Sequence, residues 1–212
     1  SRINSFAHVN YTNDKTRIGI LLCINGTGIF NRWIKTIAGN DMSYQQLNDA
    51  AAGIKPGADG LFALPFGNGA ERMLNNKMIG GHFHYLDFNI HTNAHLVRAV
   101  QEGIAFSFRY GFDIMKQNGM NPSVVRAGKA NLFLSDVFTK TFAAVNNVSV
   151  EFYEGDGSYG AAIGAGIGAA VYAEAETAFT NRKAIKVIEP TETTKYNDLY
   201  EQWKQLLLQR LQ

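Results

Sequence analysis

Three clusters of residues in this 212-residue chain have types and spacings that could do chemistry. Gly155, Gly157 and Gly160 form a G-x-G-x-x-G pattern after an expected strand, where glycines let helix N-terminal amides approach a phosphate. A dinucleotide site also needs an acidic residue about twenty positions on, at the end of the next strand. Glu174 and Glu176 lie at that distance but still in helical sequence, and Asp156 would repel a pyrophosphate. A nicotinamide-dependent oxidoreductase domain is therefore kept as an alternative.

The second cluster contains four of the five histidines. His82 and His84 would share one face of a strand, and His91 and His95 lie one helical turn apart, so a zinc site is conceivable in geometry. Against it, Cys23 is the only cysteine and His91 lies close to the expected start of a helix. We therefore expect solvated or core histidines and no metal site.

The third cluster, residues 125–131, leaves an expected strand and enters an expected helix. Ligands of α/β proteins bind at the carboxyl ends of such strands. Gly128 permits close approach to the backbone, and Asn131 can cap the helix or hydrogen-bond to the edge of a base. An ordinary connection between a strand and a helix would have the same pattern.

The first half of the chain must position part of this chemistry with short strands and three helices. Apolar patterning predicts an antiparallel hairpin of strands 6–11 and 19–24, helices over 29–37 and 44–52, a loop over 57–60, strands 61–66 and 83–88, and a helix over 94–118. On that last helix Ala99, Gly103, Ser107 and Gly111 recur every four residues. Such a groove of small residues lets another element approach closely, so we expect this helix to be central.

The second half alternates strands with helices. The pattern predicts strands 124–126, 148–152 and 185–188, helices over 132–145 and 159–175, and a final amphipathic helix over 196–207 that packs back on the body. This alternation predicts the α/β class with a parallel or mixed sheet. The helix over 159–175 is rich in Gly and Ala, and we expect it to lie flat against the sheet and not to cross a membrane.

Composition limits the class of protein. With 46% apolar and 18% charged residues, the chain is neither disordered, collagen-like nor a coiled coil, and one domain is the simplest reading. A net charge of +2 without a basic stripe argues against nucleic acid as a partner. Cys23, in an apolar run, is expected to be buried, and a lone thiol suits a reducing compartment. The start, without initiator Met or export signal, predicts a cytoplasmic piece of a longer protein.

Several motifs, in this order, resemble the C-terminal lobe of the FGGY carbohydrate kinases, with the xylulose kinase branch as the best match. They are Leu64-Pro65-Phe66, then Gly69-Ala70-Glu71-Arg72, then 81–86, then His95 to Gly103 with its Arg98–Gly103 stretch, then 125–131 at the adenosine loop, then 154–164, and the tyrosine-rich helix over 196–207. The chain departs from the family at Tyr85, where the signature has glycine, and at Gln101, where it has an aliphatic residue. Arg126-Ala127-Gly128 replaces three glycines.

The resemblance implies an actin-like ATPase (ribonuclease H-like) domain, a mixed sheet flanked by helices, with residues 1–212 as one nucleotide-binding lobe. It implies that Ala127, Gly128 and Asn131 bind adenosine and that Gly28 approaches the phosphates. Arg32 would neighbour the phosphates or the adenine. Alternatively, Gly28 is a glycine needed only for the turn, and Arg32 is a solvated surface charge. The general-base aspartate would precede Ser1, so this chain would hold no catalytic residue.

For the full protein the resemblance implies transfer of the γ-phosphoryl group of Mg-ATP to a ketopentose, D-xylulose, giving D-xylulose 5-phosphate. The cofactors would be ATP and Mg²⁺, and the partners the sugar and the protein's own N-terminal lobe, with a homodimer left open. Membranes are not expected partners. The chain alone should be inactive. A non-catalytic actin-like module for assembly or regulation stays as a second alternative.

Overall fold

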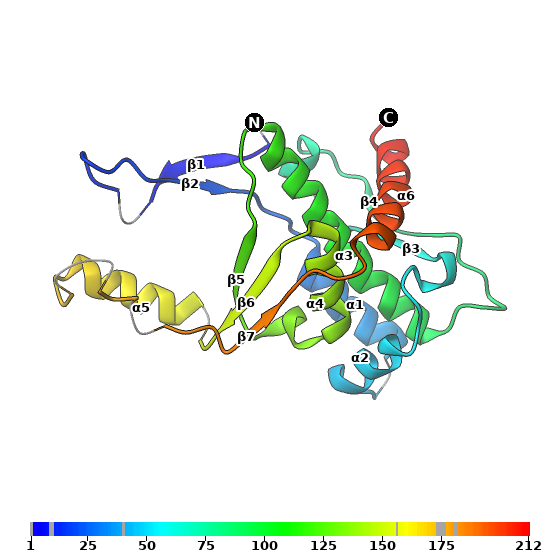
Figure 1. Cartoon of the computed structure of the whole chain (residues 1–212). Helices are drawn as coiled ribbons and strands as arrows, with labels where there is room; N and C mark the ends of the chain where they lie inside the picture. The colour runs from blue at the N-terminus through cyan, green and yellow to red at the C-terminus, as the bar shows by residue number, and fades with distance from the viewer. Residues whose placement is uncertain (1, 9–10, 40, 156, 173–176, 180–181) are drawn as a thin grey trace.

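The computed structural model describes residues 2–8, 11–39, 41–155, 157–172, 177–179 and 182–212 (Figure 1). The strands are β1 (Asn4–Ala7), β2 (Ile18–Leu21), β3 (Phe62–Phe66), β4 (Gly80–His84), β5 (Val124–Gly128), β6 (Ser149–Tyr153) and β7 (Lys186–Ile188). The α-helices are α1 (Thr27–Ala38), α2 (Tyr44–Ala52), α3 (Asn93–Gln117), α4 (Asp136–Asn146), α5 (Gly157–Gly168) and α6 (Thr193–Leu211). Short 3₁₀ turns cover Ala58–Gly60, Arg72–Leu74 and Asn131–Leu134.

Helix α3 is the centre of the molecule, as its stripe of small residues predicts. It packs against β3, α1, α2, α4 and α6. A Cβ atom on Gly103 would lie 2.1 Å from the carbonyl oxygen of Ala63, and one on Gly111 would lie 2.8 Å from Leu22 Cδ2. The absent side chains therefore let β3 and the segment after β2 press directly onto the helix.

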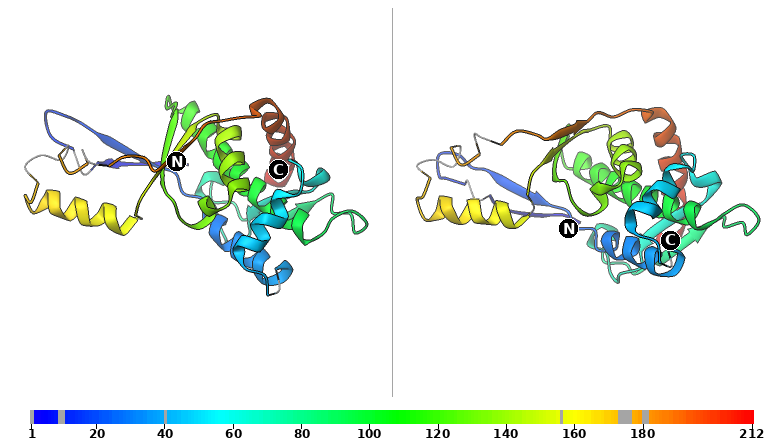
Figure 2. Two further views of the ribbon diagram at one scale, coloured as in Figure 1. Left: turned by 60° about the horizontal axis from the view of Figure 1, so that its bottom comes forward. Right: turned by 90° about the horizontal axis from the view of Figure 1, so that it is seen from below.

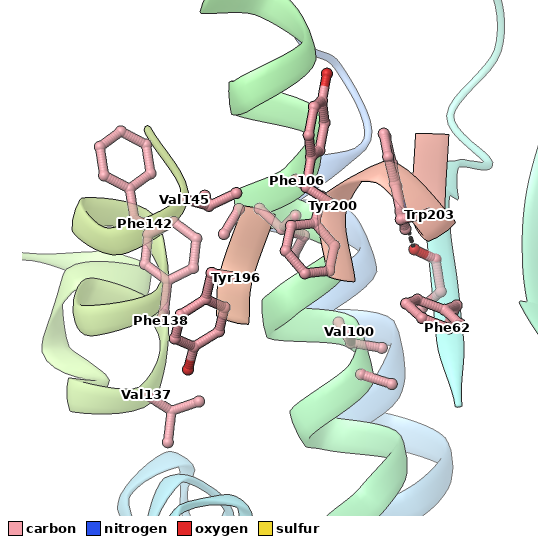
Figure 3. Packing of buried hydrophobic residues seen from close by; sticks show 14 of the residues in the cluster. Phe62, Val100, Phe106, Val137, Phe138, Phe142, Val145, Tyr196, Tyr200 and Trp203 are labelled. Carbon is pink, nitrogen blue, oxygen red and sulfur yellow. Dashed lines mark hydrogen bonds between the residues drawn. The ribbon is translucent and has the colours of Figure 1, made fainter. Parts of the chain in front are cut away.

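The aromatic face of α6 packs back on this centre, also as predicted. Tyr196, Tyr200 and Trp203 are buried, and Trp203 Nε1 donates a hydrogen bond of 2.8 Å to the carbonyl of Ala63 on β3. Figure 3 shows Tyr196 next to Phe138 and Phe142 of α4, and Trp203 on the other side of α3, next to β3. Full burial of large aromatic side chains makes this contact a main source of stability.

The strands form three small sheets. β1 and β2 make an antiparallel hairpin, and so do β3 and β4. β5 and β6 run parallel, and β7 joins β6 antiparallel. α4 packs on β6 and β7. The α/β class with a mixed sheet flanked by helices is therefore confirmed.

Helix α5 departs from the prediction. It ends at Gly168 and not at 175, and residues 173–175 of the predicted helix lie outside the described residues. It does not lie flat against the sheet: Ile163 is its one buried residue, and α5 extends from the body on the same side as the β1–β2 hairpin in all views (Figure 2). Gly and Ala side chains bury little apolar area, so a stripe of them permits close packing without driving it.

Other expectations also need correction. Cys23 is exposed, not buried. The strand over 83–88 is displaced to β4, because Tyr85 turns into the left-handed region at φ 63°. The helix over 132–145 is broken by Ser135, which caps α4 by accepting a hydrogen bond from the Phe138 amide.

The apolar face of α1 is exposed at Ile29, Trp33 and Ile37, although its spacing is that of a core-facing stripe. Ile34 is the buried residue of this helix. The loop predicted over 57–60 contains a 3₁₀ turn. In the part of the chain that the structure describes, no helix is long and apolar enough to cross a membrane.

Candidate functional site

All five residues predicted to bind nucleotide line one cleft of about 740 Å³. Gly28 and Arg32 enter it from α1, and Ala127, Gly128 and Asn131 enter it from the end of β5 and the turn that follows. The cleft is also lined by Tyr44 and Asn48 of α2 and by Ser135. The two segments are about a hundred residues apart in sequence, and the fold brings them to one surface.

The first wall of the cleft is the N-terminal end of α1. Gly26 is the N-cap residue, without a side chain to cap the helix, and the first turn has no acidic residue. The free amides and the positive end of the helix dipole at Thr27 and Gly28 therefore suit an anion. Space around Gly28 is open, since a Cβ atom there would meet nothing within 4 Å. Gly26 differs, because its Cβ would lie 1.6 Å from the carbonyl oxygen of Pro65.

Glu71 holds the turn that precedes α1. Its carboxylate accepts hydrogen bonds from the amide of Asn25 at 3.1 Å, to both oxygens, and from the amide of Gly26 at 3.2 Å. Asn68 Nδ2 also donates to the Asn25 carbonyl at 3.1 Å. Burial raises the pKa of Glu71 above its usual value, and these amide hydrogen bonds partly offset the rise. The start of α1 is thus fixed between Glu71 and β3.

The second wall is the turn after β5. The Ala130 amide donates to the Gly128 carbonyl at 2.8 Å, which makes the turn tight, and Asn131 follows in the left-handed region at φ 54°. The prediction that Asn131 caps a helix is wrong, since Ser135 caps α4 and Ala130 precedes the 3₁₀ turn. Asn131 instead lines the cleft, where its amide is available to a ligand.

A buried polar chain lies behind the cleft. Ser135 Oγ donates to Gln101 Oε1 at 2.7 Å, and Gln101 Nε2 donates to Asn48 Oδ1 at 2.8 Å. Gln101 and Ser135 are fully buried, yet both are satisfied. The chain joins α4, α3 and α2. It explains how the core accommodates an amide where the resemblance leads us to expect an aliphatic residue.

The charge of the cleft is positive. Arg32 is exposed, and among the described residues its guanidinium forms no ion pair. None of the residues that line the cleft is Asp or Glu. An anionic ligand would therefore meet Arg32 and a helix N-terminus, and no described carboxylate lines the cleft.

The Arg98–Gly103 signature has a structural role in this lobe. Arg98 Nε lies 2.6 Å from Glu102 Oε1, and Glu102 also accepts a hydrogen bond of 3.0 Å from the Gly57 amide. Arg98 further donates to the hydroxyl of Tyr196 at 3.0 Å. Burial raises the pKa of Glu102, against the lowering effect of Arg98. This buried network connects α3 to the loop after α2 and to α6, away from the cleft.

The histidines form two pairs, with ring centroids 5.8 Å apart for His82 and His84 and 5.5 Å for His91 and His95. His95 Nε2 lies 3.1 Å from Asp59 Oδ2, and the Thr92 amide donates to His95 Nδ1 at the start of α3. Within the described ranges no three His, Cys, Asp or Glu side chains are placed to hold a metal ion.

The G-x-G-x-x-G segment lies after β6 and opens α5, as expected, and Gly157 lines the cleft. A second hollow of about 600 Å³ adjoins it, lined by Gly157, Arg126, Ala127, Tyr153 and Arg182, among others. Gly157, Ala127 and Gly128 line both spaces, so the turn after β5 is accessible from two sides.

Tyr44, Asn48 and Ser135 are cleft residues that the sequence analysis missed. Tyr44 and Asn48 are four residues apart, a spacing that places two side chains on one face of a helix. This spacing predicts that the two side chains lie together, but nothing in the sequence indicates which face of α2 meets the turn after β5.

Comparison with known proteins shows which family the chain is related to. No family model matches the chain. The chain is 29% identical over 174 residues to the L-xylulose/3-keto-L-gulonate kinase of Escherichia coli, covering 79% of this chain and 34% of that protein. The crystal structure of xylulose kinase from Rhodospirillum rubrum matches 91% of this chain and 39% of its own, with a TM-score of 0.74 and 25% identity.

The chain is a relative of the FGGY-type sugar kinases. The Plasmodium falciparum glycerol kinase, solved with ADP, shares the fold, with a TM-score of 0.82 at 19% identity over 99% of this chain and 42% of its own. The lobe therefore has the actin-like ATPase fold. The chain spans about a third of the length of the curated relatives it matches, so it corresponds to one lobe of an FGGY-type kinase.

Proposed function

We propose that this chain, as a single domain over residues 1–212, is the ATP-binding C-terminal lobe of a carbohydrate kinase. The observation that carries the proposal is the single cleft formed by Gly28 and Arg32 on one side and Ala127, Gly128 and Asn131 on the other. The amides at the start of α1 would bind the phosphates, and Arg32 would neutralise part of their charge. The turn after β5 would bind the adenosine. ADP in the P. falciparum relative supports a nucleotide ligand.

The reaction proposed for the whole protein is transfer of the γ-phosphoryl group of ATP to a ketopentose, D-xylulose, giving D-xylulose 5-phosphate. Relatives named for xylulose support this sugar class. The proposed base is an aspartate of the N-terminal lobe, which would take the proton of the attacking hydroxyl. In this lobe the contribution is positioning and charge neutralisation, which dominate catalysis of phosphoryl transfer.

The described residues of the cleft do not fit a magnesium site of their own. Mg²⁺ prefers carboxylate oxygens and phosphates, and no carboxylate is among the described residues that line the cleft. We assign no step in this lobe to the metal. The exposed free thiol of Cys23 supports a cytoplasmic, reducing location for the protein.

The test is an assay of ADP release with D-xylulose and Mg-ATP. The full-length protein should turn over, and these 212 residues alone should bind ATP without turnover. Turnover of D-xylulose by the chain alone would contradict the assignment as a lobe. A full-length protein that binds ATP but phosphorylates no sugar would instead indicate an assembly or regulatory module, and tight binding of NADH without ATP would indicate an oxidoreductase domain.

A further inference from the structure

Helix α2 brings an unassigned aromatic ring and an unassigned amide to the nucleotide cleft. Tyr44 and Asn48 lie four residues apart, and both line the same cleft as Gly128 and Asn131. Tyr44 is 44% exposed, and the Lys35 ammonium lies 5.4 Å from the centroid of its ring. α2 is well anchored, because Ser43 and Gln46 form a complete capping box at its start.

The buried hydrogen-bond chain sets the orientation of the Asn48 amide. Ser135 Oγ accepts a hydrogen bond from the Phe138 amide and donates its single proton to Gln101 Oε1. With Oε1 bonded to Ser135, Gln101 donates from Nε2 to Asn48 Oδ1 at 2.8 Å. Asn48 lines the cleft, and among the described residues its Nδ2 group donates to no protein acceptor.

We propose that Tyr44 and Asn48 form a base-binding edge for a purine nucleotide, with Gln101 as the residue that orients the Asn48 amide. An amide that presents N–H donors pairs with ring-nitrogen acceptors of a purine, and an exposed aromatic ring offers a surface for the base. Gln101 is a positioning residue, since it lies buried behind Asn48 and does not reach the cleft. The inference rests on the proposed nucleotide site, and it adds that Tyr44 and Asn48 of α2 recognise the base of the nucleotide.

The experiment is calorimetric titration of the chain with ATP and with tripolyphosphate, which has no base. Loss of one hydrogen bond in N48L should weaken ATP binding about fivefold to tenfold and leave tripolyphosphate binding within about twofold. Y44A should act in the same selective way. Q45L is the matched control, because Gln45 is on the same helix, bonds to Asp49 outside this cleft, and should change neither affinity.

Gln101 is tested by a double-mutant cycle. As a single change, Q101L should weaken ATP binding. In the N48L background it should weaken ATP binding no further, because both changes remove the same contact. A general loss of structure would instead weaken tripolyphosphate binding as well, and thermal unfolding of Q101L checks this directly. Additive effects of Q101L and N48L would overturn the orienting role.

The outcomes separate the two claims. If the unaltered chain binds neither ATP nor tripolyphosphate, the proposed nucleotide site fails and this inference fails with it. If the chain binds ATP but N48L and Y44A bind it as tightly, the base-binding edge is wrong and the proposed function stands.

Discussion

The buried carboxylate of Glu71 should be essential to the turn that begins α1, and replacing it gives a prediction whose size follows from the structure. Glu71→Leu leaves the amides of Asn25 and Gly26 without their acceptor, and of these two residues Gly26 is buried and Asn25 is exposed. An unsatisfied buried amide costs about 1–3 kcal/mol, so the free energy of unfolding should fall by about 1–3 kcal/mol, mainly through Gly26. Glu71→Gln keeps one oxygen as an acceptor and should lose less, about 0.5–1 kcal/mol.

The assay is urea unfolding of the chain followed by tryptophan fluorescence, which reports the buried indole of Trp203. Glu201→Leu is the control, because Glu201 is exposed and, within the described ranges, its one ion pair is with Lys204 at 3.7 Å, so its loss should cost less than about 0.5 kcal/mol. A Glu71→Leu variant within about 0.5 kcal/mol of the unaltered chain would refute the view that this carboxylate fixes the turn.

The same residue predicts a pH dependence. Burial raises the folded-state pKa of Glu71 above its usual 4.5, so the stability it contributes is complete below that value and is lost as pH rises through the raised pKa. The Glu71→Gln variant has no ionisable group at this position. The unaltered chain should therefore gain stability relative to Glu71→Gln as pH falls from 7 toward about 4.5. A constant difference over this range would show that burial does not shift the pKa.

Three further changes should test the packing by thermal or urea unfolding. Gly103→Ala should lower the free energy of unfolding by about 1–3 kcal/mol, because its Cβ would clash with the Ala63 carbonyl. Gly28→Ala is the control, since its Cβ meets open space and should change stability by less than about 0.5 kcal/mol. Equal effects of the two changes would contradict the close approach of β3 to α3. Trp203→Phe should lower stability by about 2–4 kcal/mol through lost volume and the lost bond to Ala63, and a neutral result would place the indole outside the core. Tyr85→Gly should raise stability by about 0.5–1 kcal/mol, since Tyr85 is strained at φ 63°; a loss would mean that its side-chain contacts outweigh the strain.

The sequence predicts the elements around α3 well because their patterns reflect local physics. Ser43 and Gln46 determine where α2 begins through side-chain capping. The small residues of α3 predict the close approach of β3 at Gly103. Five residues of the cleft were also predicted, through the resemblance, from two segments far apart in the chain. Their meeting at one surface depends on the topology.

What the sequence could not predict depends on which face of an element finds a partner. The apolar stripe of Ile29, Trp33 and Ile37 has the spacing of a core face but is exposed in this lobe. The Gly-rich helix α5 has the pattern of close packing but few side chains to drive it. The sequence does not explain the polar Gln101 at a core position, because its hydrogen-bond partners, Ser135 and Asn48, are distant in sequence and meet it only in the fold.

The central claim is that two separate turns bind one purine nucleotide, and ¹⁵N-resolved NMR of the chain titrated with ATP tests it most directly. The account predicts saturable shifts of the backbone amides of Gly28, Gly128 and Asn131 together, with one dissociation constant. Shifts confined to one of the two turns, or to neither while the chain stays folded, would contradict it.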